Sequence, residues 1–260
     1  MKVQNQLLMI LILAGSCCFI SCKKDKAGNK NNLVVSPPEQ GPESGIYIPA
    51  RLSSGKSNMI FSYTKTGALT KIDYEHGDST ILKFNTTSKP VEFRCYKSGI
   101  LTSATVYSRN ANGWIIKAQA YTVSGKDQTQ AGFYTISYDS NGQITAVVYY
   151  DSNNRLVETQ QYNYSPEGNL TGQKSAVLTA NYSYDLNNGL FKQAGYAWVF
   201  ALERENSLFL SVVNNIQQCN YTEKSQSNQQ LNYVYNKAGY PTKITATALG
   251  LTATTNVIYQ

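Results

Sequence analysis

Residues 133–173 read FYTISYDSNGQITAVVYYDSNNRLVETQQYNYSPEGNLTGQ and contain one short pattern three times. In each copy a tyrosine is followed four residues later by Gly or Asn, and an apolar residue comes two positions after that. The copies begin at Tyr138, Tyr150 and Tyr164. Because Gly and Asn adopt positive φ at low cost, the fourth position is predicted to be the left-handed residue of a tight hairpin turn. The alternating Tyr, Val, Ile and Thr residues on either side predict antiparallel strands.

The same pattern recurs outside this stretch. It is complete in residues 61–72, and looser copies place aromatic residues at intervals of 10 to 12 residues between positions 63 and 107. This interval corresponds to one strand plus one turn, which is typical of a continuous meander. Two further copies lie in residues 182–190 and 231–244. We therefore expect an all-β fold, an antiparallel meander of hairpins that forms one large twisted sheet, an open barrel or a half-pipe.

The pattern breaks in residues 191–228. Trp198, Leu202 and Phe209 lie near helical spacing, although the β-branched end of this run is also compatible with a strand. We expect a short helix near 198–213, or an irregular segment, that covers one end of the sheet.

Composition supports a folded β protein and limits the function classes. The 260 residues are 42% hydrophobic and 15% charged, with 20 tyrosines and 18 glycines. Tyrosine suits the pleated, half-buried surface of a strand, and frequent Gly, Asn and Ser favour turns. The formal charge of +7 is spread among carboxylates instead of being concentrated in one basic stretch, so the sequence argues against a nucleic-acid partner.

The N-terminal residues 1–21 have the layout of a secretory signal, with Lys2 followed by a short apolar run. The end of this run, Phe19-Ile-Ser-Cys22, resembles a bacterial lipobox, and the resemblance implies a lipid on Cys22 that anchors the protein to a membrane. A plain signal peptide is the alternative. Residues 22–45 are rich in Lys, Asn, Pro, Ser and Gly and are predicted to form a flexible tether, followed by a single β-meander domain over 46–260.

The aromatic-x-Tyr-Asp-x-x-Gly-x-Leu/Ile-Thr pattern resembles the YD repeat of RHS and related bacterial surface proteins. With the lipobox, the tether and the closing motif in residues 233–244, the chain is similar to Bacteroidetes lipoproteins of the DUF4595 type. The likeness covers most of residues 58–190 and 229–260. It implies a β-rich envelope protein anchored in the outer membrane, facing the periplasm or the cell surface, and it provides no catalytic residues to transfer. Residues 23–26 resemble the charged segment that sends some such lipoproteins to the surface, or they simply begin a solvated linker.

Candidate catalytic groups are few. The single histidine, His76, lies in a predicted turn, and no Cys/His cluster exists, so we expect no catalytic triad, metal site or cofactor. Paired carboxylates can hydrolyse glycosides, and Glu203 and Glu205 form the only acidic pair outside the repeats. A carboxylate-dependent, glycan-active enzyme using residues 195–219 is therefore the alternative function. Two further acids, expected on an exposed strand face and in a turn, are Glu158 and Glu167.

Aspartate follows the tyrosine in three copies, at Asp139, Asp151 and Asp185. Oxygen-rich loops can bind calcium, but an aspartate at the first turn position also accepts backbone N–H groups, and turn closure is the favoured interpretation. Cys95 and Cys219 are the only cysteines after residue 22, and they can form a disulfide outside the cytoplasm.

The abundant tyrosines have a structural and a functional interpretation. Both rings of a Tyr-x-Tyr triplet point to one face of a strand, where they stabilise the sheet or, if exposed to solvent, stack on a glycan or a partner protein. Trp114 and Trp198, both next to irregular positions, are the candidate ligand-binding rings. Our main expectation is a lipid-anchored envelope protein that acts as a non-catalytic binding or structural module for polysaccharide or a partner protein.

Overall fold

A computed structural model describes residues 45–260 of the chain, except residues 56, 205 and 224. The predicted signal peptide, Cys22 and the tether up to residue 44 lie outside the described residues. Among the residues that are described, no helix is long and apolar enough to cross a membrane.

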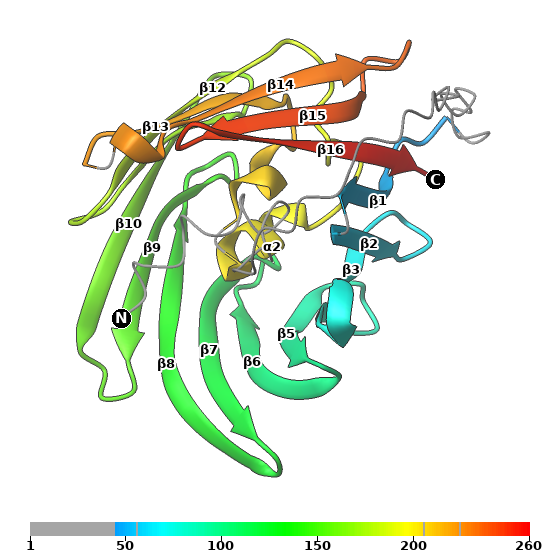
Figure 1. The fold of residues 1–260 in the computed structure, drawn as a ribbon. Helices are drawn as coiled ribbons and strands as arrows, with labels where there is room; N and C mark the ends of the chain where they lie inside the picture. Colours follow the sequence, from blue (N-terminus) through cyan, green and yellow to red (C-terminus); the bar gives the residue numbers. More distant parts are fainter. Residues whose placement is uncertain (1–44, 56, 205, 224) are drawn as a thin grey trace, which may run out of the picture.

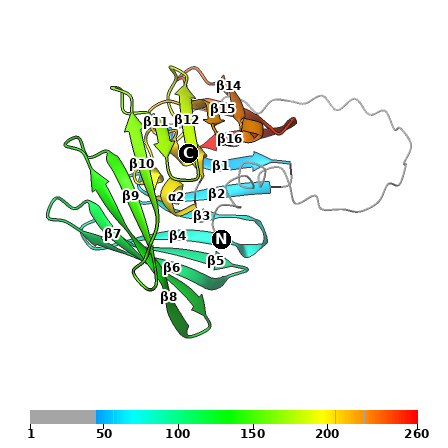
Figure 2. The same cartoon turned by 90° about the vertical axis from the view of Figure 1, so that its left-hand side faces the viewer.

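The described chain forms a barrel of sixteen antiparallel strands, in which each strand pairs with the next one in sequence (Figure 1 and Figure 2). The strands are β1 (Pro49–Ser54), β2 (Ser57–Tyr63), β3 (Leu69–Asp73), β4 (Ser79–Phe84), β5 (Pro90–Lys97), β6 (Ile100–Arg109), β7 (Ile115–Ser124), β8 (Asp127–Tyr138), β9 (Ile144–Asp151), β10 (Leu156–Tyr164), β11 (Leu170–Lys174), β12 (Thr179–Tyr184), β13 (Ile216–Tyr221), β14 (Gln229–Tyr235), β15 (Pro241–Ala248) and β16 (Leu251–Tyr259). The helical elements are α2 (Ala197–Arg204) and the 3₁₀ helices η1 (Glu75–Gly77), η2 (Ser207–Leu210) and η3 (Ser225–Ser227).

Pairing between the first and last strands closes the barrel. β1 pairs with β16 in antiparallel register, with Leu52 opposite Val257. The predicted all-β antiparallel meander is confirmed, but the sheet closes on itself instead of remaining an open barrel or half-pipe. Closure removes the two unpaired edges that an open meander presents.

The turns that follow even-numbered strands lie at one end of the barrel, which we call the repeat end. In the turn after β8, Gly142 has φ of 79° and its N–H donates to Asp139 O at 3.2 Å. The Asp139 N–H donates to Gln143 O at 2.9 Å, and Asp139 Oδ1 accepts from the N–H groups of Asn141 and Gln143, each at 2.9 Å. Asn154, with φ of 62°, is the left-handed residue of the next copy, in the turn between β9 and β10 at the opposite end of the barrel. The predicted left-handed position and turn-closing aspartate are both confirmed.

One turn at the repeat end contains a long insertion. Residues 186–214 connect β12 to β13 by way of the barrel interior, and we call them the plug. At its base the Asp185 N–H donates to Asn215 O and the Asn215 N–H donates to Asp185 Oδ1, both at 3.0 Å. Asp139 and Gln143 make the same two bonds in the regular turn, so the plug is an insertion within a turn of the repeat.

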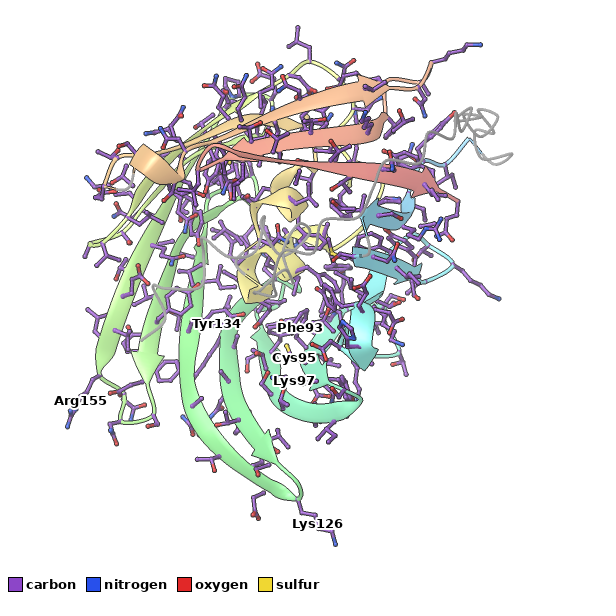
Figure 3. All side chains as sticks on the ribbon, viewed as in Figure 1. Phe93, Cys95, Lys97, Lys126, Tyr134 and Arg155 are labelled. Atoms are coloured by element: carbon purple, nitrogen blue, oxygen red, sulfur yellow. The ribbon has the colours of Figure 1, made fainter. Side chains whose placement is uncertain are left out.

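The plug contains α2 and η2, which together span most of the helix predicted near 198–213. Figure 1 shows α2 surrounded by the ring of strands, inside the barrel instead of over one end of the sheet as expected. Phe191 and Phe209 of the plug lie 5.7 and 6.4 Å from the ring of Phe61 on β2, and Phe200 lies 5.2 Å from Phe93 on β5. All five rings are buried, and Figure 3 shows Phe93 on the inner side of the wall. Because a sixteen-stranded wall encloses more space than its own side chains fill, the plug supplies much of the core.

Five tyrosines fasten neighbouring strands at the repeat end. Each lies at or near the end of an even-numbered strand, and its hydroxyl donates to the carbonyl of the first residue of the preceding strand at 2.5–2.9 Å. We call these contacts latches. The five donor and acceptor pairs are Tyr63 and Pro49, Tyr138 and Ile115, Tyr184 and Leu170, Tyr233 and Ile216, and Tyr259 and Pro241.

Candidate functional site

The plug leaves a cavity of about 110 Å³ between itself and the wall formed by β9 to β14, and we call it the tyrosine cavity. Its lining combines aromatic rings with side-chain amides. The rings are Tyr149, Tyr162, Tyr164, Tyr182, Tyr221 and Trp198, and the amides are Gln160, Gln173, Gln229 and Asn206.

Strand and helix periodicity bring these side chains together. Side chains alternate between the two faces of a strand, so Gln160 and Tyr162 of β10 both face the interior. Trp198 and Leu202, four residues apart on α2, project from one face of the helix toward them. The cavity is therefore bounded by the meander on one side and by the insertion on the other.

A hydrogen-bond network orders the amides along the wall. The Tyr162 hydroxyl donates to Gln160 Oε1 at 2.7 Å, and Gln173 Nε2 donates to the same oxygen at 3.2 Å. The Tyr182 hydroxyl donates to Gln173 Oε1 at 3.2 Å. The chain of bonds crosses β10, β11 and β12, so these polar groups are held in place before any ligand binds.

The described side chains that line the tyrosine cavity are uncharged. Burial raises the pKa of Tyr164 to about 12, and burial also raises the pKa values of Tyr182 and Tyr221 above the ordinary value. These phenols therefore stay protonated at neutral pH. Among the described residues that line the cavity, none is a carboxylate, lysine, arginine or histidine. The lining favours a neutral, polar ligand over an ion.

Gln229 differs from the other lining amides. Its side chain belongs to a residue that is only 6% exposed, and its Oε1 atom has no hydrogen-bond partner in the structure. A buried acceptor without a donor is unfavourable, and such atoms in native structures usually serve a water or a ligand.

Glu203 belongs to α2 but does not line the tyrosine cavity. Its Oε1 atom accepts from the hydroxyls of Tyr107 at 2.7 Å and Tyr134 at 2.5 Å, and its Oε2 atom accepts from Thr105 Oγ1 at 3.0 Å. Burial, and secondarily the Glu203 carboxylate, raise the pKa values of both tyrosines well above their ordinary value. The hydroxyls of β6 and β8 therefore bind Glu203 and fasten α2 to the wall.

The other candidate acids do not complete a carboxylate pair in the cavity. Glu158 was expected on an exposed face, but it is half-buried and its Oε2 atom accepts from Gln160 Nε2 at 3.4 Å, because β10 turns this residue inward. Glu167 is exposed in a turn, as predicted, and Glu205 is outside the described residues. In the described part of the chain, no three His, Cys, Asp or Glu side chains are grouped so that they could hold a metal ion.

The structure separates the two candidate tryptophans. Trp198 lines the tyrosine cavity. Trp114 lies at the repeat end, where its ring is 5.0 Å from that of Tyr138 and covers Gly142 so closely that a Cβ atom there would be 3.2 Å from it. Only Trp198 is therefore placed to contact a ligand in the cavity.

The candidate disulfide is not formed in the structure. Cys95 of β5 and Cys219 of β13 are both thiols. Cys219 is buried, and burial raises the pKa of its thiol to about 12, so this group is unreactive at neutral pH.

Sequence reasoning missed the amides of the cavity. Gln160 and Gln173 are ordinary strand residues in the repeat pattern, and nothing local distinguishes the inner from the outer face. Gln160 precedes Tyr162 by two residues, and this spacing alone predicts that both side chains lie on one face of the strand.

No protein-family model matches the chain, and no curated protein matches it at a significant level. The similarity to DUF4595-type lipoproteins and YD repeats therefore stays a prediction. Among solved structures, a porin-like protein from Bacteroides uniformis has a TM-score of 0.56 and 11% identity, and the match covers 82% of this chain and 98% of that one. A porin-like protein from Bacteroides vulgatus has a TM-score of 0.44 and 13% identity, with 82% and 99% covered.

A third solved structure, a DUF3836 family protein from Bacteroides vulgatus, has a TM-score of 0.21 and 21% identity. That match covers 31% of this chain and 81% of the other. At these identities the comparison with the Bacteroides uniformis protein shows that the barrel fold is shared, and nothing about activity.

Proposed function

We propose that this chain is a lipid-anchored protein of the bacterial envelope that binds a short neutral saccharide in the tyrosine cavity and does not catalyse a reaction on it. The main support is the lining of the cavity, which places one tryptophan and five tyrosines beside ordered amides and contains no charged group among its described residues. Aromatic rings offer an apolar face for the C–H groups of a sugar, and phenol and amide groups exchange hydrogen bonds with its hydroxyls.

The envelope location is supported by two independent features. The N-terminal residues resemble a lipoprotein signal that ends at Cys22. The barrel fold is also that of a protein from Bacteroides uniformis described as porin-like. Both features agree with an anchor in the outer membrane, with the barrel facing the periplasm or the cell surface.

A pore is the second candidate function, because that similar structure is described as porin-like. The lumen of a porin is polar and filled with water. The interior of this barrel instead contains the buried plug residues Phe191, Phe200 and Phe209. We therefore favour binding over conduction.

The enzyme alternative receives less support. Glycoside hydrolysis uses two carboxyl groups that flank the bond to be cleaved. Glu203 is the described carboxylate of the 195–219 region that reaches the interior; hydroxyls of Thr105, Tyr107 and Tyr134 bind it, and it does not line the cavity. A saccharide bound in the tyrosine cavity would not be flanked by two acids.

A glycan array probed with the purified protein tests the proposal. We expect the wild-type protein to bind at least one class of neutral glycan, and Trp198→Ala to lower its affinity at least tenfold because a cavity ring is lost. Trp114→Ala is the matched control, since this ring covers a turn outside the cavity, and it should leave affinity unchanged. Absence of wild-type binding, or equal binding by both variants, would overturn the proposal.

Because Trp198 also packs in the plug, a second variant separates binding from folding. Tyr182→Phe keeps the ring and removes only the hydroxyl that donates to Gln173 Oε1. We expect it to fold, with a loss of about 1 kcal/mol for one neutral hydrogen bond, and to bind the same glycan several-fold more weakly.

A further inference from the structure

We infer that the ligand is an elongated neutral saccharide that crosses the rim of the barrel at β13 and β14, with one ring in the tyrosine cavity and the following rings in a groove outside. This inference rests on the proposed function and specifies the length and the path of the ligand. Three observations support it: the short pairing of these two strands, the groove outside them, and the unpaired side-chain oxygen of Gln229 between the groove and the cavity.

The pairing between β13 and β14 is short. Their paired positions are Gln218 with Gln230 and Cys219 with Gln229, whereas β14 and β15 pair from Gln229 through Tyr235. Beyond the short pairing the chain passes through η3 before β14 begins. Gln229 is the first residue of β14, so both pairs lie beside the rim of the barrel opposite the repeat end, where the interior adjoins the exterior.

A groove of about 300 Å³ lies on the outside of this seam, and we call it the amide groove. Its polar side chains are Gln218, Asn220, Asn228, Gln229, Gln230 and Thr247. Amide and hydroxyl groups donate and accept hydrogen bonds without charge, so they suit the hydroxyls of a neutral sugar in the same way as the cavity does.

Gln229 connects the two spaces. It lines both the tyrosine cavity and the amide groove. Gln229 is only 6% exposed, and its Oε1 atom has no hydrogen-bond partner in the structure. A hydroxyl of a saccharide that passes from one space to the other would donate to this oxygen.

The sizes of the two spaces favour an extended ligand. A hollow that holds one water needs roughly 10–15 Å³. The cavity of about 110 Å³ therefore has room for a group of about one sugar ring, and the groove of about 300 Å³ has room for more than one. A single monosaccharide would leave the groove unused.

Isothermal titration of the full chain with cello-, malto- and chito-oligosaccharides of one to six residues tests the inference. We expect affinity in at least one series to rise at least tenfold between the monosaccharide and the trisaccharide. The double variant Asn220→Ala/Gln230→Ala should abolish this rise and leave the monosaccharide affinity unchanged, because both side chains are exposed and lie in the groove. The matched control is Gln217→Ala/Asn232→Ala, at exposed positions of the same strands that do not line the groove.

Gln229→Leu tests the connecting residue. We expect it to keep the fold, since it replaces an unpaired amide by an apolar group of similar size, and to lower trisaccharide affinity at least tenfold. Affinity that is independent of chain length, with binding still lost in Trp198→Ala, would overturn this inference and leave the proposed function standing. Failure of the wild-type protein to bind any of the three series would overturn both.

Discussion

The turn after β8 and the base of the plug close with the same hydrogen bonds but enclose very different lengths of chain. Asp139 and Gln143 bracket three residues, and Asp185 and Asn215 bracket residues 186–214. In both places the aspartate N–H donates to the partner carbonyl, and the partner N–H donates to the aspartate Oδ1. The hydrogen-bonded aspartate therefore fixes where the two strands end, whatever lies between them.

The difference shows how a repetitive wall acquires a specific interior. A loop roughly ten times longer costs about 2 kcal/mol more to close. Burying one large apolar side chain stabilises by about 1.5–3 kcal/mol, and the plug buries Phe191, Phe200 and Phe209. The burial outweighs the cost of closing the loop, so an insertion in one turn provides both the core and one wall of the tyrosine cavity.

Alkaline pH is expected to break latches at several places around the repeat end at once, with an effect similar to that of the largest substitution below. Burial raises the pKa values of the latch tyrosines Tyr63, Tyr184 and Tyr259 far above the value of about 10 that they have in the unfolded chain. Stability is therefore fully present below pH 10 and falls as the pH rises above it, because the unfolded chain loses these protons first. At pH 11 the three groups together remove about 4 kcal/mol. Urea denaturation at pH 8, 10 and 11 should show a midpoint that is slightly lower at pH 10 than at pH 8 and falls steeply above pH 10.

Phe209→Ala is expected to disrupt the packing of the plug and to leave the hydrogen bonds of the turns unchanged. Phe209 is fully buried and its ring lies 4.9 Å from that of Phe191, so truncation leaves a cavity and should lower the free energy of unfolding by about 3–5 kcal/mol. Leu186→Ala is the matched control in the same segment, because Leu186 is 98% exposed, and it should cost less than about 0.5 kcal/mol. Urea denaturation measures both. Similar losses for the two variants would mean that the plug is not part of the core.

Asp185→Ala and Asp139→Ala compare the two closures directly. Asp185 is buried, and its carboxylate accepts from the N–H groups of Asn187 and Asn215 and from the Tyr235 hydroxyl. Its loss leaves several buried donors unpaired and should cost about 2–4 kcal/mol. Asp139 accepts only two backbone N–H groups in a half-buried turn, so its loss should cost about 1 kcal/mol. Equal losses of stability in thermal denaturation would contradict the view that the hydrogen bonds of Asp185 at the base hold the plug in place.

The sequence was sufficient for the features that depend on local chemistry. The strands and the turns follow from alternation and from Gly or Asn at a fixed distance after tyrosine, and Gly142 and Asn154 have the positive φ that this predicts. The turn-closing role of Asp139 and Asp151 follows from the preference of aspartate for the first turn position, and both accept the N–H groups two and four residues later.

Features that depend on distant contacts could not be predicted in the same way. Closure joins Leu52 to Val257, and the local sequence of β1 and β16 does not specify how many strands complete a ring. The short helix was expected over an end of the sheet, because nothing in its own residues reveals that a closed wall surrounds it. Gln229 was missed because its importance comes from the seam between β13 and β14 and not from its neighbours in sequence.

Two latches provide the smallest and sharpest test of the comparison, because Tyr138 precedes the regular turn and Tyr184 precedes the plug. Their hydroxyls donate to Ile115 O at 2.8 Å and to Leu170 O at 2.7 Å. Replacing either tyrosine by phenylalanine removes one neutral hydrogen bond and keeps the ring, so each should cost about 1 kcal/mol. If the length of chain inserted after the aspartate does not affect the stability of the strands, the two losses of stability will be equal. They will also add in the double variant, because the two latches share no partner. A markedly larger loss for Tyr184→Phe in urea denaturation would instead show that the latch beside the insertion supports the plug as well as the strands.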